Sequence, residues 1–398
     1  MSPVVFMRHD MTVIELTRTP VCSRGGLFPL HRPILIVFLL LTWLLAAAPP
    51  ASTREPNEYV LTPNKKHATF SFLAAGGHHV CATVSDGTIS CWGNDMMGQL
   101  GNGAQVDQDL DKPAEVIGVT TGVAVAGGDD HTCALLRNGS IWCWGGNRYN
   151  QLSGELPSSP QPIQVETISR AAGVTTGAYH SCALVAGGKI SCWGYNESGQ
   201  LGGTTEPQSS VPVEVPGVSH AIALSAGASH TCVVRHGGAV LCWGGNTYGQ
   251  LGNGTRTGGA TPVDVTGLPP ARSVSAGASH TCAVLQDGRI ACWGWNATGQ
   301  LGNGTMDDSV SPVFVKGLTH AMHVAAGHFH SCALLKNGRV ACWGSNTNGE
   351  LGSGPPTGSS TPVFVDGIPR AKAIAVGDRF TCILIKQDGT AKCWGGIK

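Results

Sequence analysis

The sequence is poor in charged residues and carries no excess of either sign. Only 13% of its 398 residues are charged, and 25 Lys and Arg balance 25 Asp and Glu. Because a face built to bind nucleic acid normally leaves an excess of basic residues, this balance argues against nucleic acid as a partner, although it is compatible with a local basic patch. The 56 glycines, which favour turns, argue together with the scarcity of charge against a helical or disordered chain.

The sequence also lacks the residue patterns on which enzymes usually depend. Paired carboxylates, a Ser/His/Asp set, phosphate-binding loops and zinc-ligand spacings do not stand out. We therefore expect a non-enzymatic protein with no catalytic residues, no cofactor and no metal. A hydrolase or lyase built on the same fold remains an alternative.

A single long apolar run lies near the N-terminus, and it is short for a membrane span. It covers residues 34–48, follows His31 and Arg32, and ends in Ala46-Ala47-Ala48. A transmembrane helix needs about 20 apolar residues, whereas a secretory signal has about 7–15 and a small-residue cleavage site. Residues 1–48 therefore predict a cleaved signal peptide and a secreted or periplasmic protein. The alternative is a membrane anchor formed by residues 34–48.

The rest of the chain repeats one phrase seven times. Its first cysteine recurs at spacings of 49 to 52, and a Cys-Trp-Gly triplet follows in each copy. Each copy predicts four short strands, which in the sixth copy cover 321–327, 330–335, 339–343 and 362–365, with a turn at Asn337-Gly338. Four strands per repeat of this length is the period of a propeller. Residues 67–398 therefore predict an all-β, seven-bladed β-propeller of four-stranded antiparallel blades.

The last copy stops after its third strand. Residues 58–61, which lie in a predicted linker over 49–66, resemble the fourth strands of the other copies. We expect this N-terminal strand to complete the last blade, which would leave the ring without an exposed edge.

Fourteen of the 15 cysteines fall into seven hairpin pairs, and the other, Cys22, lies in the predicted signal peptide. If Ser85-Asp86-Gly87 is a three-residue hairpin loop, the cysteines of the first pair face each other across two strands, at a distance that a disulfide can span. Structural zinc sites favour much closer spacings. The predicted disulfides are Cys81–Cys91, Cys133–Cys143, Cys182–Cys192, Cys232–Cys242, Cys282–Cys292, Cys332–Cys342 and Cys382–Cys393.

The repeated string Cys-Trp-Gly-x-Asn-x-x-Gly-Gln-Leu-Gly, preceded by Ala-Gly-x-x-His-Thr-Cys-Ala, resembles the regulator of chromosome condensation repeat. The resemblance covers residues 67–398 in all seven copies, with drift such as Glu350 for Gln and Phe380 for His. The founding member of the family is a nuclear exchange factor for a small GTPase that binds chromatin, so exchange is an alternative function. Repeats of 49 to 52 residues leave no room for the inserted wedge that exchange uses there. A secreted bacterial β-lactamase inhibitor of this type, which uses one face of its ring, is a nearer analogue.

Two sets of positions are candidate sites. The six repeated histidines that precede the first cysteines could form a metal ring, but a repeated polar side chain more often satisfies repeated backbone groups. Variable positions before these histidines and after Trp-Gly carry residue types typical of binding hot spots. The candidates are Tyr179, Tyr195, Trp295, Phe329 and Arg379. The sequence thus predicts a monomer that binds a protein or glycan partner through one face, without contact to membrane or nucleic acid.

Overall fold

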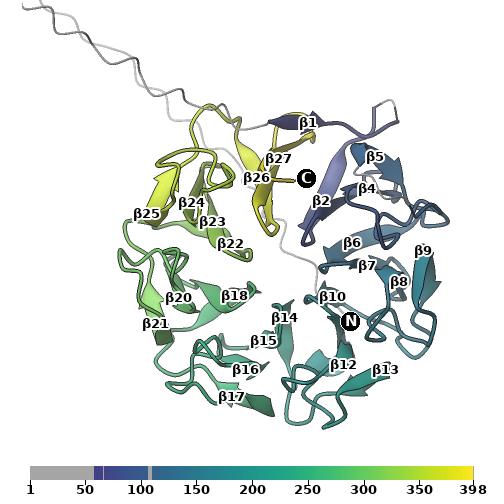
Figure 1. The fold of residues 1–398 in the computed structure, drawn as a ribbon, viewed down its shortest axis with the longest axis horizontal. Coiled ribbons are helices and arrows are strands. Elements are labelled where there is room, and N and C mark those ends of the chain that lie inside the picture. The colour runs from purple at the N-terminus through teal and green to yellow at the C-terminus, as the bar shows by residue number, and fades with distance from the viewer. Residues whose placement is uncertain (1–57, 66, 106–109, 398) are drawn as a thin grey trace, which may run out of the picture. The chain divides into compact units, whose positions relative to one another are not determined.

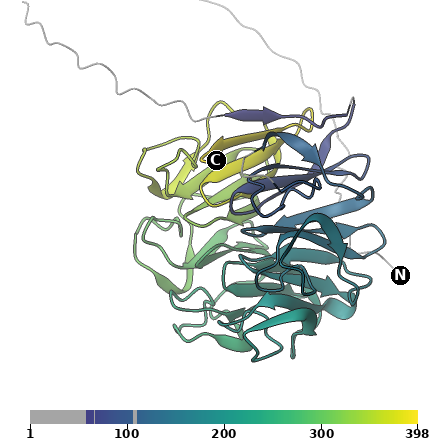
Figure 2. The same ribbon diagram turned by 45° about the vertical axis from the view of Figure 1, so that its right-hand side comes forward.

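The computed structural model describes residues 58–65, 67–105 and 110–397. In this part of the chain the strands form seven four-stranded sheets arranged as a ring (Figure 1). The turned view in Figure 2 shows the sheets stacked face to face around the ring. The predicted all-β, seven-bladed propeller is confirmed. The predicted signal peptide lies outside the described residues, and the domain boundaries stay predictions.

Each blade runs from an inner strand at the centre of the ring to an outer strand at the rim (Figure 1). Blade 1 contains β2 Phe70–Ala75, β3 His79–Val84, β4 Ile89–Gly93 and β5 Leu110–Glu115. Blade 2 contains β6 Gly122–Gly127, β7 His131–Leu136, β8 Ile141–Gly146 and β9 Ser158–Gln164. Blade 3 contains β10 Gly173–Thr176, β11 His180–Val185, β12 Lys189–Tyr195 and β13 Gln208–Glu214, with a short 3-10 turn at Ala186–Gly188. Blade 4 contains β14 Ala221–Ala226, β15 His230–Arg235, β16 Val240–Gly244 and β17 Gly259–Asp264.

The remaining three blades repeat this plan. Blade 5 contains β18 Ala271–Ala276, β19 His280–Leu285, β20 Ile290–Gly294 and β21 Ser309–Phe314. Blade 6 contains β22 Ala321–Ala326, β23 His330–Leu335, β24 Val340–Gly344 and β25 Ser359–Phe364. Blade 7 contains β26 Ala371–Val376, β27 Phe380–Ile385, β28 Ala391–Gly395 and β1 Tyr59–Leu61. Among the described residues, no helix is both long and apolar enough to traverse a lipid bilayer.

The strands agree with the predicted ones except at the rim. In blade 6 the predicted strand 330–335 coincides with β23, whereas the outer strand starts at Ser359 instead of Pro362. The register shifts between Cys342, which pairs with Val363, and Gly344, which pairs with Ser359, so β25 extends further toward its start than predicted. Pro362, which has no N–H to donate, is tolerated because β25 is an edge strand.

The N-terminal strand closes the ring as predicted. β1 pairs antiparallel with β28, with Tyr59 opposite Cys393 and Leu61 opposite Ala391. Leu61 is buried in the core between blades 7 and 1. The N-terminal strand and the C-terminal strands therefore belong to one sheet, and β28 has no free edge.

All seven predicted disulfides are present, each between the second and third strands of a blade. The paired cysteines face each other directly, with Cα atoms 4.0 to 4.1 Å apart. The longer turn of blade 7 keeps the same register, with Cys382 opposite Cys393. Each bridge lies in a hydrophobic core shared with the next blade, as Cys282 and Cys292 do beside Trp343 of blade 6. The disulfide thus serves as buried apolar packing as well as a covalent link.

A ring of glycines sets how closely the blades approach at the centre. At each of these positions an added Cβ atom would lie only 2.2 to 2.8 Å from a glycine carbonyl oxygen of the next blade, closer than real Cβ atoms come. The contacts run around the whole ring and close from the last blade to the first. The seven positions are Gly76, Gly128, Gly177, Gly227, Gly277, Gly327 and Gly377.

The glycine ring yields a stability prediction. In a Gly227→Ala variant the new methyl group would lie 2.2 Å from the Gly277 oxygen. We expect the midpoint of urea unfolding to fall by an amount equivalent to about 1–3 kcal/mol, because the backbones must move apart.

A matched control is Gly259→Ala, because nothing lies within 4 Å of an added Cβ there and its φ is not left-handed. This variant should keep or slightly raise the stability of the protein, by about 0.4–1 kcal/mol. Equal unfolding midpoints for the two variants would show that the inner ring is not tightly packed.

Candidate functional site

The six repeated histidines, one candidate metal site, join neighbouring blades. Each is fully buried, and its Nε2 lies 2.7 to 2.9 Å from a Ser or Thr hydroxyl of the next blade. That hydroxyl donates to a backbone carbonyl at 2.8 to 3.0 Å, so the histidine donates through Nε2–H. The pairs are His79–Thr132, His131–Ser181, His180–Thr231, His230–Thr281, His280–Ser331 and His330–Thr381. The histidines therefore do satisfy repeated groups, but these are side-chain hydroxyls rather than the backbone groups we expected.

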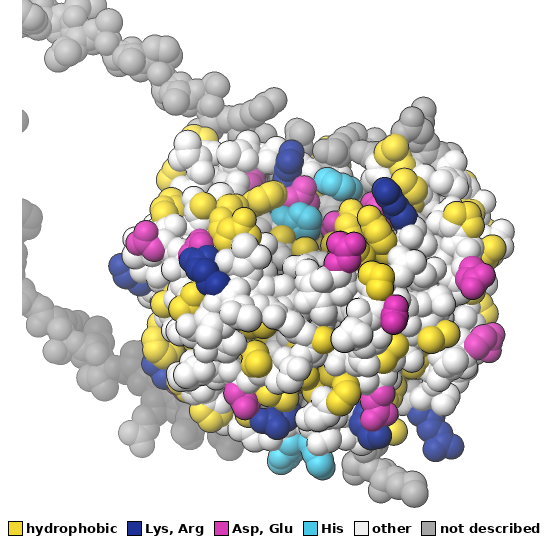
Figure 3. Space-filling model, turned by 60° about the horizontal axis from the view of Figure 1, so that its bottom comes forward, with side chains coloured by type: hydrophobic (Ala, Val, Ile, Leu, Met, Phe, Trp, Pro, Cys, Tyr) yellow, Lys and Arg dark blue, Asp and Glu magenta, His cyan; other side chains and the backbone are white. Residues whose placement is uncertain are grey.

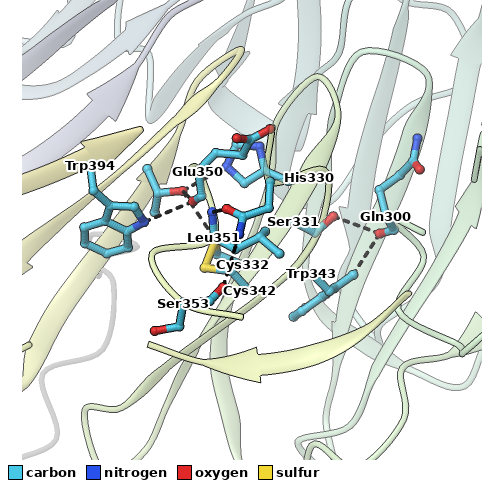
Figure 4. The surroundings of a disulfide bond; sticks show 12 residues. Gln300, His330, Ser331, Cys332, Cys342, Trp343, Glu350, Leu351, Ser353 and Trp394 are labelled. Carbon is cyan, nitrogen blue, oxygen red and sulfur yellow. Dashed lines mark hydrogen bonds between the residues drawn. A yellow bond between two sulfur atoms is a disulfide. The ribbon is translucent and has the colours of Figure 1, made fainter. Parts of the chain in front are cut away.

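The accepting carbonyl belongs to the Gln of the Gly-Gln-Leu-Gly loop, and it is shared. Figure 4 shows the Gln300 carbonyl accepting from both Ser331 and the indole of Trp343. The Glu350 carbonyl takes the same role for Thr381 and Trp394. The repeated His, Trp and Gln thus form one interblade network. Within the described ranges, no group of three or more His, Cys, Asp or Glu side chains is placed to hold a metal ion.

The boundary between blades 7 and 1 replaces this network with apolar contacts. Phe380 stands where the other blades have His, and Val80 stands where they have Ser or Thr. Both residues are fully buried in the core between the two blades, together with Phe70. The indole Nε1 of Trp92 has no hydrogen-bond partner among the described residues. Replacement of His by Phe380 in blade 7 is therefore matched by replacement of Ser or Thr by Val80 in blade 1, so an apolar pair takes the place of a hydrogen-bonded pair.

This complementarity predicts the outcome of a double-mutant cycle. Thr281→Val alone strands the buried Nε2–H of His230 and should lower the free energy of unfolding by about 1–3 kcal/mol. The double variant His230→Phe/Thr281→Val reproduces the pair found between blades 7 and 1, and it should be more stable than the two single effects added together. Unfolding in urea measures the coupling energy. Strict additivity would contradict the exchangeability of the polar and apolar pairs.

The same histidines predict acid sensitivity. Burial, the largest cause in each case, lowers the pKa of His79 and His230 to about 4 and that of the other four to about 3. The unfolded chain binds protons near the ordinary pKa of 6.5, so stability present above that pH is lost as the pH falls toward 3–4. Each histidine contributes up to about 1.4 kcal/mol per pH unit to this slope.

The His230→Phe/Thr281→Val variant provides the control, because it has one histidine fewer. Its unfolding free energy between pH 6 and 4.5 should fall less steeply than that of the unsubstituted protein, by about 1.4 kcal/mol per pH unit. Equal slopes in urea titrations at several pH values would contradict the assignment of the acid sensitivity to these histidines.

The predicted binding residues lie at one end of the propeller, which we call the loop face. It is formed by the turns between first and second strands and the loops between third and fourth strands. Tyr179 and Tyr195 come together through Tyr149, whose ring centroid lies 5.2 and 4.8 Å from theirs. Trp295 and Phe329 form a second group with Tyr248, with centroids 5.7 and 6.2 Å from that of Trp295. We call these groups the tyrosine cluster and the tryptophan cluster.

Short contacts hold the aromatic residues in place. The side-chain carbonyls of Gln151 and Gln250 accept from the backbone N–H groups of Tyr149 and Tyr248 at 2.9 and 3.0 Å. The hydroxyl of Tyr195 donates to Glu197 at 2.6 Å, and this bond raises the pKa of Tyr195 to about 12. The clusters are therefore positioned without a partner, which lowers the entropy lost on binding.

Tyr149 and Tyr248 were missed from the sequence. Both stand two residues before the Gln of the Gly-Gln-Leu-Gly loop, a position that carries Met97, Ser198, Thr298 and Asn348 in other copies. The variability of that position was the available signal. Arg379, the fifth predicted residue, belongs to neither aromatic cluster.

Arg379 lies instead in a charged group at the mouth of the central channel. The channel, about 110 Å³ in volume, is lined mainly by glycine and alanine, with Asp129 and His328 among its walls. The His328 ring lies 3.1 Å from Asp378 and 3.5 Å from Asp129, while Arg379 reaches Asp378 at 3.4 Å. Burial alone would lower the pKa of His328, but the two carboxylates outweigh it and raise that pKa to about 9. His328 therefore lies between two carboxylates that favour its protonated form.

Figure 3 shows one face of the molecule on which histidine and acidic side chains lie close together with hydrophobic side chains nearby. The contacts place these types together on the loop face, where the His328 ring also meets Phe329 with centroids 6.0 Å apart. The charged mouth and the tryptophan cluster are therefore continuous. Such a surface can bind a partner through aromatic contacts, while the charged groups at the centre of the ring select partners of complementary charge.

Comparison with known proteins gives this architecture its family. Residues 49–322 match the model of the RCC1-like domain, and residues 323–350 and 337–384 match models of the regulator of chromosome condensation (RCC1) repeat. A mouse secretion-regulating guanine nucleotide exchange factor is 29% identical over 101 residues, which are 24% of this chain and 22% of the mouse protein. The chain spans less than a quarter of the length of the curated relatives it matches first.

Two solved structures share the fold. Prp20p from Saccharomyces cerevisiae, studied for its binding to Gsp1p and histones, superposes with a TM-score of 0.70 at 22% identity, over 82% of each chain. The ectodomain of the receptor kinase CR4 from Physcomitrella patens superposes with a TM-score of 0.50 at 25% identity, over 82% of this chain and 74% of that one.

Proposed function

The chain belongs to the RCC1-like family, and from that membership we propose that it is an exported, non-enzymatic propeller that binds a protein partner through its loop face. The observation that carries the proposal is the grouping of six partly exposed aromatic residues in two clusters on that face. The seven tryptophans of the repeat are buried in the cores between the blades and serve the fold. The six aromatics instead occupy positions where the copies differ.

The type of residue favours a protein partner over a glycan. Tyr, Trp and Arg are the residues that most often carry binding energy between proteins. Met97 of blade 1, which is 40% exposed, adds an apolar side chain to the loop face beside blade 2, because a Cβ added at Gly146 would meet the Met97 Cβ at 3.5 Å. The paired charges at the channel mouth supply the polar contacts that fix orientation in such interfaces.

Three observations support export. Seven disulfides form stably in oxidising compartments and are rare in the cytosol of ordinary cells. The apolar run at residues 34–48 has the length of a secretory signal. The CR4 ectodomain shows that a propeller of similar shape can serve in an extracellular part of a receptor. Nucleotide exchange, suggested by the mouse relative, is the competing function, but that match covers only 24% of this chain.

The proposal predicts where a partner can be crosslinked. A photoreactive phenylalanine analogue at Tyr179 or Phe329 should yield a discrete adduct in the exported fraction of the native host, because both positions lie on the loop face. The same analogue at Phe314, an outer-strand residue 46% exposed under Arg289, should yield none. Mass spectrometry identifies the partner and shows whether the exported chain begins after residue 48.

With the partner identified, Tyr179→Ala and Trp295→Ala should each weaken its affinity at least tenfold, as hot-spot truncations of about 2 kcal/mol do. Phe314→Ala is the matched control and should bind as tightly as the unsubstituted protein. Adducts at Phe314 alone, or loss of affinity in all three variants, would contradict a loop-face site. Acceleration of nucleotide release from a small GTPase would favour the exchange-factor function instead.

A further inference from the structure

The two ends of the propeller carry opposite charge. The end opposite the loop face, which we call the turn face, consists of the hairpin turns between second and third strands and the connections between blades. Its described loop residues include nine Lys or Arg and five Asp or Glu, whereas those of the loop face include three and ten. The balance of charge over the whole sequence therefore conceals two unlike surfaces.

The basic residues of the turn face follow one another across blades 5 to 7. The backbone N–H of Lys336 donates to the His320 carbonyl at 2.9 Å, and that of Lys386 donates to the Arg370 carbonyl at 2.9 Å. The turn that contains Lys336 also touches Arg370, because an added Cβ at Gly338 would meet the Arg370 Cβ at 3.0 Å. We call His320, Lys336, Arg370 and Lys386 the basic arc.

The side chains of the basic arc are exposed, and no ion pair among the described residues neutralises Lys336, Arg370 or Lys386. All four residues are exposed, and the ion pairs found among the described residues include none of them. The nearest acids in sequence are Asp366 and Asp388, and the Asp388 carboxylate accepts from the backbone N–H and hydroxyl of Thr390. Two other basic residues of the turn face already form ion pairs, Lys65 with Asp86 and Arg289 with Asp287.

A second basic spot lies on the same face. An added Cβ at Gly139, in the turn that begins with Arg137, would meet the Cα atom of Arg170 at 2.7 Å. Both arginines are exposed, and neither forms an ion pair with another described residue. Basic side chains on several blades attract anions to this end of the ring. An extended anion could contact more than one blade at once.

We propose that the turn face binds an anionic polysaccharide through the basic arc. Such a site goes beyond the protein partner proposed for the loop face, because it lies at the other end of the ring. A polysaccharide is favoured over nucleic acid because single-stranded nucleic acid is usually held by aromatic residues on which bases stack. Two aromatic rings near this face, the exposed Phe314 and the partly exposed Phe364, lie instead beneath Arg289 and Arg339.

The probe for this proposal is heparin, a sulfated polysaccharide. The intact protein should bind it with an affinity that falls as salt rises, because each neutralised anion releases a counterion. The triple variant Lys336→Gln/Arg370→Gln/Lys386→Gln should bind at least tenfold more weakly at 0.1 M salt. Its plot of log affinity against log salt should be shallower by about two, which corresponds to the loss of about three contacts.

The matched control removes the same charge from the other end. Arg148→Gln/Arg256→Gln/Arg379→Gln eliminates the three basic residues of the loop-face loops and should bind heparin within twofold of the unsubstituted protein. Equal loss in both triple variants, or no binding by the unsubstituted protein, would overturn the proposal. Tighter binding to a DNA duplex than to heparin would overturn the choice of a polysaccharide. Trp295→Ala should leave heparin affinity unchanged, which separates this site from the protein-binding loop face.

Discussion

The propeller depends on how closely neighbouring blades approach at the centre of the ring. Seven glycines bring each inner strand so near the next blade that an added Cβ would overlap a carbonyl oxygen. The His rings pack into the same space, since the Cε1 atom of His180 lies 2.2 Å from a Cβ placed on Gly177. Only at this spacing can each imidazole reach a hydroxyl of the following blade, and that hydroxyl reach a glutamine carbonyl. The repeated Gly, His and Gln residues therefore form the interface between two neighbouring blades rather than the interior of a single blade.

The boundary between the last and first blades shows which parts of this interface can vary. Phe380 and Val80 exchange a hydrogen-bonded pair for an apolar one, and both remain fully buried. Either change alone would lower stability, because a single replacement would remove one partner of a buried hydrogen bond. The close approach itself is retained there, since a Cβ on Gly377 would lie 2.8 Å from the Gly76 oxygen. Backbone spacing is thus the stricter requirement, and the polar network is one of two ways to fill the space beside it.

The fold was predictable from the sequence because its decisive contacts are local or repeated. The disulfide register follows from the hairpin turn, and seven copies of one phrase reveal the ring. The grouping of Tyr149 with Tyr179 and Tyr195 was not predictable in this way, because these residues come from different loops that meet only when blades 2 and 3 are stacked. The ion pair of His328 with Asp129 was not predictable for the same reason, because the two residues belong to blades 6 and 2 and meet only when the ring is closed. The neutral composition allowed a local basic patch but could not place one, because only the fold sorts the charged turns and loops onto the two ends of the ring.

The difference between the two ends has a consequence for how the proposed activities can coexist. In a propeller all turns of one kind lie at one end, so substitutions in hairpin turns and in interblade loops alter separate surfaces without disturbing the buried strands between them. A protein held by its turn face on an extended polyanion would direct its loop face away from that surface. The excess of acidic residues in the loop-face loops would oppose binding in the reverse orientation, because like charges repel. The polarity of the ring would then fix its orientation, and the aromatic clusters would remain free for a second molecule.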